Sequence, residues 1–273
     1  MVPDPGSPPG TIAVVGCGVI GAGWAARFAL NGCDVRVADP APAATATVEA
    51  VLHNAVVAWE ALGLERPPAG EVVVTDSVAA AVDGAEFVQE SVPERLDLKH
   101  AVVAEIEAAA GRDAVIASST SGLRPSVLQA GMAVPGRLVV GHPFNPVYLL
   151  PLVEVVAGEQ TDPGAAERAE HVYRTLGMHP LRVRVEIDAF IADRLMEALW
   201  REALWLVHDG VATTEEIDTA MTRGFGLRWA QMGLFETFRV AGGPGGFRHF
   251  LAQFGPALEL PWTKLSDVPD LDD

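Results

Sequence analysis

Short apolar runs rich in β-branched residues alternate with alanine-rich stretches along the first 184 residues. The runs are 12–15, 35–38, 72–75, 87–89, 115–117 and 138–140. Continuous apolar runs of this length are typical of strands that are buried on both faces of a parallel sheet. Helices are expected between them, near 22–31, 43–61, 77–82, 96–110 and 125–130. We therefore expect an α/β fold with a doubly wound, mostly parallel sheet.

Two further apolar runs, Leu152–Val156 and Leu181–Val183, flank a helical stretch near 163–176 and extend the predicted sheet. The pattern changes after about residue 185. From 188 to 208 apolar residues recur at helical spacing, and Asp188 is the expected N-cap of that helix.

The rest of the chain shows no strand pattern. Thr213 and Glu216 stand in capping-box register, which predicts another helix start, and a glycine-rich break at 242–246 precedes a last amphipathic stretch. We therefore expect 11–185 to form the sheet domain and 186–273 a smaller all-helical domain for substrate and dimerisation.

Both ends of the chain are expected to be flexible. Residues 1–10 lack a basic region and an apolar core, so they are expected to be a flexible leader rather than a signal peptide. The acidic end at 267–273 is expected to fray. The mostly apolar stretch 11–30 contains Arg27 and begins as a strand, which argues against a transmembrane helix.

Charge and cysteine content exclude several classes of protein. The chain has 19 Lys and Arg against 36 Asp and Glu, a net charge of −17, which argues against binding nucleic acid or an anionic membrane. Cys17 and Cys33 are too few for a disulfide framework or a zinc site. These features favour a cytoplasmic protein without a structural metal.

A glycine motif points to a dinucleotide. Gly16, Gly18 and Gly21 fit G-x-G-x-x-G between a predicted strand and a predicted helix, with Val19 and Ile20 at the helix start. Such a turn lets the backbone approach a pyrophosphate at the helix N-terminus. Asp39, 23 residues after Gly16, ends the next strand, where a carboxylate binds the ribose hydroxyls and repels a 2′-phosphate. The sequence therefore predicts a Rossmann-type NAD site.

A second group of polar residues suits alcohol oxidation. His142 ends one predicted strand, and Glu154 lies in the next apolar run after a proline-rich loop. A histidine oriented by a glutamate can take a hydroxyl proton near neutral pH. Ser121, on the loop after a strand, could hydrogen-bond the same hydroxyl. A buried structural histidine is the alternative for His142 considered alone.

Longer motifs resemble the 3-hydroxyacyl-CoA dehydrogenase superfamily and, within it, the L-carnitine 3-dehydrogenase branch. They are 93–99, 119–122, 141–146, 152–155, 190–195, 198–203, 254–258 and 260–263. The resemblance implies NAD-dependent oxidation of a 3-hydroxyl by a homodimer. It makes His142 the base, Glu154 its partner and Ser121 a ligand of the substrate oxygen, and it places Glu94 and Lys99 near the cofactor.

The chain departs from the family pattern in three places. The wider superfamily has Asn at the position of Asp193, whereas the carnitine branch resembles this chain there, and we count Asp193 among the expected catalytic residues. A Pro-Gly pair common before that helix is replaced by Asp188-Ala189. The chain stops several helical turns before its relatives, which affects the expected dimer contacts.

The distribution of basic residues bears on the substrate. The stretch 40–65 contains no Lys or Arg to hold the phosphates of coenzyme A. A compact cation such as carnitine fits the acidic chain better, held by aromatic rings and by Asp193 or Glu197. The candidate rings are Phe190, Trp200, Trp205, Phe225, Trp229, Phe235 and Phe238. Core packing is the alternative for each ring.

Two other functions stay open at this point. One is a dehydrogenase of another small 3-hydroxy acid or of a hydroxyacyl-CoA. The other is a non-catalytic NAD-binding protein, either a sensor or a crystallin-like protein. The joint presence of Ser121, His142 and Glu154 disfavours the second, because NAD binding alone does not need them.

Overall fold

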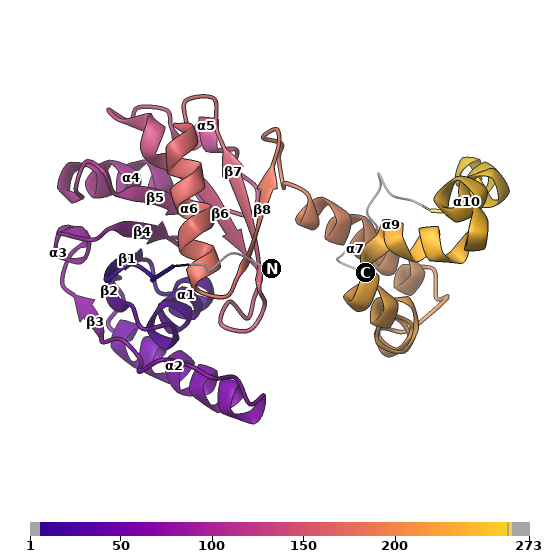
Figure 1. The fold of residues 1–273 in the computed structure, drawn as a ribbon, viewed down its shortest axis with the longest axis horizontal. Coiled ribbons are helices and arrows are strands. Elements are labelled where there is room, and N and C mark those ends of the chain that lie inside the picture. The colour runs from indigo at the N-terminus through magenta and orange to yellow at the C-terminus, as the bar shows by residue number, and fades with distance from the viewer. Residues whose placement is uncertain (1–5, 261, 264–273) are drawn as a thin grey trace. The chain divides into compact units, whose positions relative to one another are not determined.

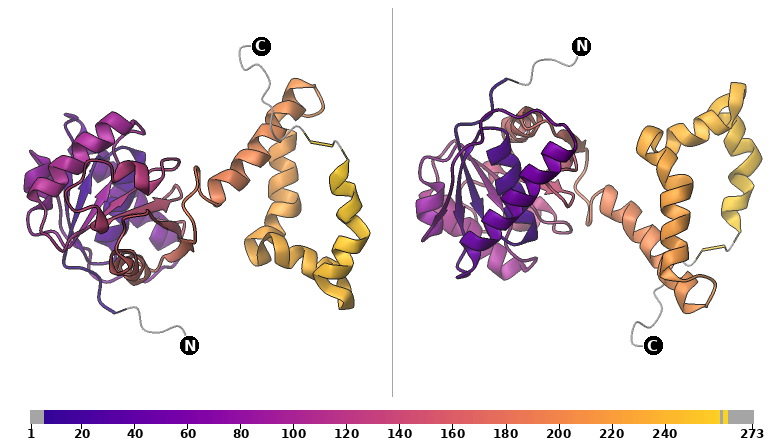
Figure 2. Two further views of the ribbon diagram at one scale, coloured as in Figure 1. Left: turned by 90° about the horizontal axis from the view of Figure 1, so that it is seen from above. Right: turned by 90° about the horizontal axis from the view of Figure 1, so that it is seen from below.

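The computed structural model describes residues 6–260, 262 and 263. The chain divides after Ile191 into two compact units, an α/β unit and a helical unit (Figures 1 and 2). The domain boundary inferred from the sequence, after residue 185, stays a prediction. Residues 1–5 of the expected leader and the acidic end at 267–273 lie outside the described residues.

The first unit is built on one eight-stranded sheet. The strands are β1 (Thr11–Val15), β2 (Asp34–Ala38), β3 (Val72–Thr75), β4 (Phe87–Glu90), β5 (Val115–Ser118), β6 (Leu138–Pro143), β7 (Leu152–Ala157) and β8 (His179–Val183). Their order in the sheet is β3-β2-β1-β4-β5-β6-β7-β8, and every pair is parallel except β6 and β7. The expected mostly parallel, doubly wound sheet is confirmed.

Helices cover both faces of this sheet. They are α1 (Val19–Leu30), α2 (Ala44–Ala61), α3 (Val78–Val82), α4 (Leu96–Ala109), α5 (Pro125–Leu128) and α6 (Pro163–Thr175). Trp24 and Phe28 of α1 pack with Tyr173 of α6 in one core cluster, together with residues of α2. Val103 of α4 and Leu128 of α5 belong to a second cluster with residues of α3. The central strands β1, β4, β5, β6 and β7 are therefore buried on both faces, which explains their apolar runs, whereas the edge strands β3 and β8 are partly exposed.

The described part of the second unit is helical. It contains α7 (Ala192–His208), α8 (Thr214–Ala220), a π-helical turn (Met221–Phe225), α9 (Gly226–Ala241) and α10 (Gly246–Phe254), with short 3₁₀ turns at Gly243–Gly245 and Gly255–Glu259. The predicted capping box is confirmed. Thr213 Oγ1 accepts from Glu216 N at 3.2 Å, and Glu216 Oε2 accepts from Thr213 N at 2.8 Å.

The predicted N-cap at Asp188 is wrong, because α7 begins only at Ala192. Ala189 and Phe190 have φ angles of 57° and 49°, in the left-handed region that a right-handed helix excludes. The chain instead turns so that Phe190 is fully buried in the first unit. Asp188 forms an ion pair with Arg124, with 3.1 Å between Oδ1 and Nε.

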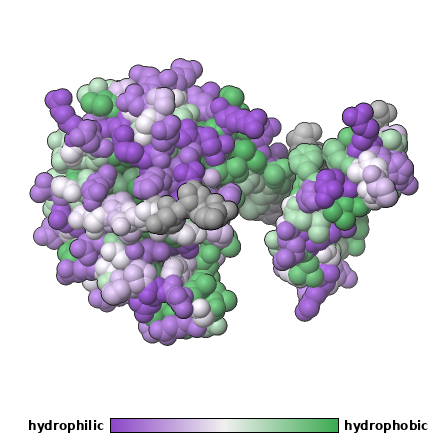
Figure 3. Space-filling view, in the orientation of Figure 1, coloured by the Kyte–Doolittle hydropathy of each residue, from purple (hydrophilic) through white to green (hydrophobic). Residues whose placement is uncertain are grey.

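Large apolar side chains are exposed on the second unit (Figure 3). Those of α7, α9 and α10 include Leu195, Met196, Leu199, Trp200, Leu227, Phe235, Val240, Leu251 and Phe254. Among the described helices, none is both long enough and apolar enough to cross a membrane.

Candidate active site

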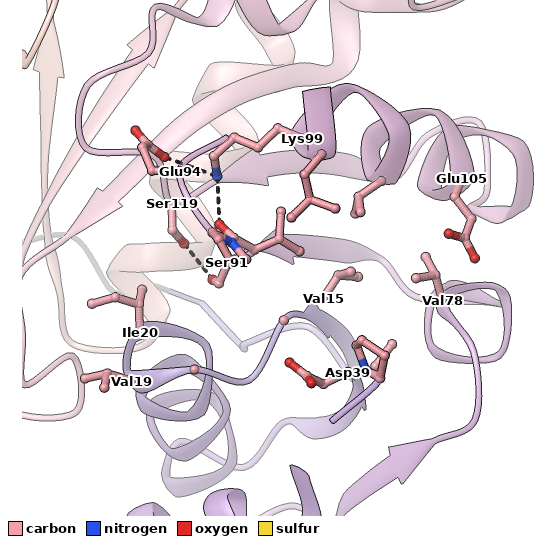
Figure 4. Close-up of a pocket in the computed structure, with 18 of the residues that line it drawn as sticks. Val15, Val19, Ile20, Asp39, Val78, Ser91, Glu94, Lys99, Glu105 and Ser119 are labelled. Carbon is pink, nitrogen blue, oxygen red and sulfur yellow. Dashed lines mark hydrogen bonds and ion pairs between the residues drawn. The ribbon is translucent and has the colours of Figure 1, made fainter. Parts of the chain in front are cut away.

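A cavity of about 980 Å³ opens at the carboxyl ends of the parallel strands (Figure 4). Residues that follow or end β1, β2, β4, β5 and β6 line it. The sheet order reverses between β1 and β4, and ligands of open α/β sheets bind at such a switch point. Predicted residues in the lining are Gly16, Gly18, Val19, Ile20, Asp39, Glu94, Lys99, Ser121 and His142.

The glycine motif forms the turn between β1 and α1, and its three glycines are needed for different reasons. Gly16 has φ of +92°, and a Cβ there would lie 2.7 Å from the carbonyl oxygen of Ser91. A Cβ on Gly21 would lie 1.8 Å from the carbonyl oxygen of Gly16, so Gly21 allows the helix to pack closely. Gly18 has no atom within 4 Å of its Cβ position, which leaves open space for a ligand.

This open space lies at the start of α1. The N-cap, Gly18, supplies no side-chain hydrogen bond to the first turn, so backbone N–H groups of that turn can bind an anion. The turn therefore fits the pyrophosphate of a dinucleotide.

Asp39 is held beside the glycine turn at the end of β2. Its Oδ2 accepts from the backbone N of Cys17 at 2.7 Å, and its Oδ1 accepts from Ala41 N at 2.8 Å. Burial and the negative charge of Asp39 raise the pKa of the Cys17 thiol to about 11. The thiol is thus protonated at neutral pH, which suits a buried spacer and not a nucleophile.

Lys99 of α4 is almost fully buried beside the cavity. Its Nζ lies 2.9 Å from Glu90 Oε1, 3.1 Å from the carbonyl oxygen of Val92 and 3.4 Å from Glu94 Oε2. Glu90 is fully buried and also accepts from Ser118 Oγ. Lys99 therefore neutralises a carboxylate of the protein and is not available as a mobile phosphate-binding cation.

His142 and Glu154 lie directly opposite each other on the antiparallel strands β6 and β7. His142 Nδ1 is 2.9 Å from Glu154 Oε2, and Glu154 is fully buried. Since a carboxylate only accepts, Nδ1 carries the hydrogen, which makes Nε2 the basic nitrogen of the neutral ring. Glu154 Oε1 accepts from Ile191 N at 3.0 Å, and Phe190 packs 5.7 Å from the imidazole between ring centroids.

Of the remaining predicted residues, some line the cavity and others lie outside its lining. Ser121 is exposed on the loop after β5 and lines the same cavity as His142. Glu154 stands behind His142, outside the lining. Asp193 lies in the first turn of α7, in the second unit. Most candidate rings of the second unit pack against aromatic neighbours in that unit, such as Phe225 against Trp229 at 4.6 Å between centroids, whereas Trp200 is exposed.

The sequence interpretation gave no role to three polar residues of this site. Glu90 ends β4, and Ser91 and Ser119 are the first residues after β4 and β5. A charged residue at the end of an apolar strand was a signal for Glu90. Ser119 begins the motif 119–122, and Ser91 gave no signal beyond its position after a strand.

Both parts of the chain match models of one protein family. Residues 11–187 match the model described as "3-hydroxyacyl-CoA dehydrogenase, NAD binding domain", and residues 190–265 match "3-hydroxyacyl-CoA dehydrogenase, C-terminal domain". The chain belongs to the 3-hydroxyacyl-CoA dehydrogenase family. This membership confirms the predicted family, the NAD cofactor and, at the level of the family, the prediction of a dehydrogenase.

Individual relatives align with most of the chain. This chain is 57% identical to the L-carnitine dehydrogenase of Mesorhizobium japonicum, over 96% of its own length and 72% of the relative's. It is 59% identical to the L-carnitine dehydrogenase/betainyl-CoA thioesterase of Agrobacterium fabrum, again over 96% of the chain, and spans 54% of that longer protein.

A solved structure shares the fold. A crystal structure of 5-formyl-3-hydroxy-2-methylpyridine 4-carboxylic acid 5-dehydrogenase, described as an NAD⁺-dependent dismutase, matches with a TM-score of 0.87. It is 34% identical to this chain, and the match covers 96% of this chain and 84% of that one.

Proposed function

We propose that this protein oxidises the 3-hydroxyl of L-carnitine to 3-dehydrocarnitine, with NAD as the electron acceptor. The observation that carries the proposal is the His142–Glu154 pair, which presents an oriented imidazole to the cavity that also holds the glycine turn and Asp39. A protein that only binds a dinucleotide and catalyses no reaction does not require a buried carboxylate behind a histidine.

The reaction divides between the cofactor and the protein. NAD, when bound, supplies a nicotinamide ring that accepts a hydride from the hydroxyl carbon. The hydroxyl proton passes to Nε2 of His142, while Glu154 holds Nδ1–H and stabilises the imidazolium. We assign a hydrogen bond to the substrate oxygen to Ser121, and we assign the counter-charge for the trimethylammonium group to Asp193.

The lack of basic side chains after β2 supports a compact cation over a coenzyme A ester. Lys99, which lines the cavity, is already paired with Glu90. Helix α2, in the stretch without Lys or Arg, offers no cation to phosphates. The two relatives described above are named for carnitine.

A substrate panel tests the proposal. We expect NADH to form with L-carnitine, and much more slowly with 3-hydroxybutyrate, gulonate or 3-hydroxybutyryl-CoA. The readout is absorbance of NADH at equal substrate concentrations. Preference for the CoA ester would refute the carnitine assignment and leave the dehydrogenase class intact.

A neutral carnitine analogue is the sharper arm of this test. With tert-butyl in place of trimethylammonium the shape is kept and the charge is lost. We expect kcat/KM to fall by about 10-fold or more, because aromatic and carboxylate contacts to a cation are lost. Equal efficiency with both compounds would show that the enzyme has no cation site.

Assembly and location complete the proposal. The large exposed apolar side chains of α7, α9 and α10 support a homodimer, because burying them against a second copy is favourable. Light scattering is expected to give twice the chain mass, and a monomer at micromolar concentration would contradict it. We also propose a cytoplasmic location, where NAD and reduced thiols occur together.

A further inference from the structure

Two serine hydroxyls meet on the wall of the cofactor cavity. Ser91 follows β4, Ser119 follows β5, and both line the cavity (Figure 4). Their Oγ atoms are 2.8 Å apart, a distance at which either one could be the donor. The groups around Ser119 decide the direction of this hydrogen bond.

Ser119 Oγ receives two hydrogen bonds from buried donors. Trp24 Nε1 donates at 3.1 Å, and Gln89 Nε2 donates at 2.8 Å. An indole N–H can only donate. The amide orientation of Gln89 is fixed as well, because Nε2 lies 3.3 Å from the carbonyl oxygen of Gly141 and Oε1 accepts from the Tyr173 hydroxyl at 2.8 Å. A reversed amide would place two carbonyl oxygens against each other.

A serine hydroxyl accepts two hydrogen bonds and donates one. Since Trp24 and Gln89 occupy both acceptor positions of Ser119, its proton is donated to Ser91 Oγ. The proton of Ser91 therefore points elsewhere. Among the described residues, Ser119 is the sole hydrogen-bonding partner of the Ser91 hydroxyl, and Ser91 is part of the cavity wall.

Ser91 also lies against the glycine turn. Its carbonyl oxygen is the atom that a Cβ on Gly16 would meet at 2.7 Å, and its Cβ lies 3.2 Å from the Cβ position of Gly21. The turn fits the pyrophosphate of the cofactor, so a donor beside it would face cofactor oxygen atoms.

We propose that Ser91 is a cofactor-binding residue whose hydroxyl donates a hydrogen bond to an oxygen of the ribose–pyrophosphate portion on the nicotinamide side of NAD. Trp24, Gln89 and Ser119 act as positioning residues that make Ser91 a donor before the cofactor binds. A donor fixed in this way loses little rotational freedom on binding. The inference rests on the NAD site and is independent of the carnitine assignment.

Binding measurements without substrate test the proposal. For Ser91→Ala we expect the Kd values of NADH and ADP-ribose to rise by about 3- to 10-fold, the range for one hydrogen bond. AMP affinity is expected to stay within about 2-fold, because AMP lacks the ribose and second phosphate on the nicotinamide side. Ser91→Cys, which offers only a weak S–H donor, is expected to show the same separation.

Two other variants are the controls. Ser126→Ala removes a serine hydroxyl that accepts from Glu159 N outside the cavity lining, and all three Kd values are expected to stay unchanged. Asp39→Ala is expected to weaken the binding of all three ligands, AMP included, because each contains the adenosine ribose. Unchanged NADH affinity in folded Ser91→Ala and Ser91→Cys would overturn the proposal, as would an equal loss for AMP. If Ser91→Ala lowered the affinity for NADH but not for ADP-ribose, the atom that accepts the Ser91 hydrogen bond would lie on the nicotinamide. That result would overturn the assigned position.

Discussion

Replacement of His142 by Ala is expected to lower kcat with L-carnitine by roughly 10²–10⁴-fold, the range for a positioned general base. His142 is the cavity residue whose basic nitrogen is fixed by a buried carboxylate, through the 2.9 Å contact between Nδ1 and Glu154 Oε2. Without it the hydroxyl proton has to pass to water while the hydride leaves. The measurement is the steady-state rate of NADH formation.

The accompanying variants separate catalysis from folding. NADH affinity of His142→Ala is expected to be unchanged, because the glycine turn and Asp39 are intact. Glu154→Gln should also lower kcat, since the imidazolium loses its anionic partner. His53→Ala, which removes an exposed histidine of α2, is the matched control and should retain full activity. Near-full activity of His142→Ala would show that the histidine is structural.

Replacement of Lys99 by Met is expected to lower the free energy of unfolding by about 3–5 kcal/mol, the cost of leaving a buried charge without its partner. The side chains of Lys99 and Glu90 are 1% and 0% exposed, and their 2.9 Å contact is the shortest that Lys99 makes with a carboxylate. Met has similar volume, so the loss reflects charge and not a cavity. Urea unfolding followed by circular dichroism measures the change.

A double variant identifies the cause of that loss. Lys99→Met combined with Glu90→Gln removes both charges and is expected to be more stable than Lys99→Met alone. Arg174→Met is the control, because Arg174 forms a half-exposed ion pair with Glu170 and such pairs contribute at most about 1 kcal/mol. If Lys99→Met and Arg174→Met were equally stable, the buried pair would have no special role.

The apolar pattern by itself located all eight strands, most clearly the central ones, because strands buried on both faces are apolar along most of their length. The glycine turn could also be predicted from the sequence, because the backbone dictates the residue type there. Gly16 has φ of +92°, and a Cβ on Gly21 would collide with the carbonyl oxygen of Gly16, so local geometry restricts both positions to glycine. The capping box at Thr213 depends on residues three apart and was equally visible.

Only the tertiary structure decided the start of α7 and the partners of the buried polar groups. The helical spacing extends back to Asp188, but burial of Phe190 beside His142 draws the chain into the left-handed region first. Lys99 of α4 pairs with Glu90 at the end of β4. Trp24 of α1 donates to Ser119, which is 95 residues later in the sequence. Such contacts join separate strands and helices, so no local periodicity encodes them. The direction of the Ser91 hydroxyl depends on Trp24, Gln89 and Ser119 together.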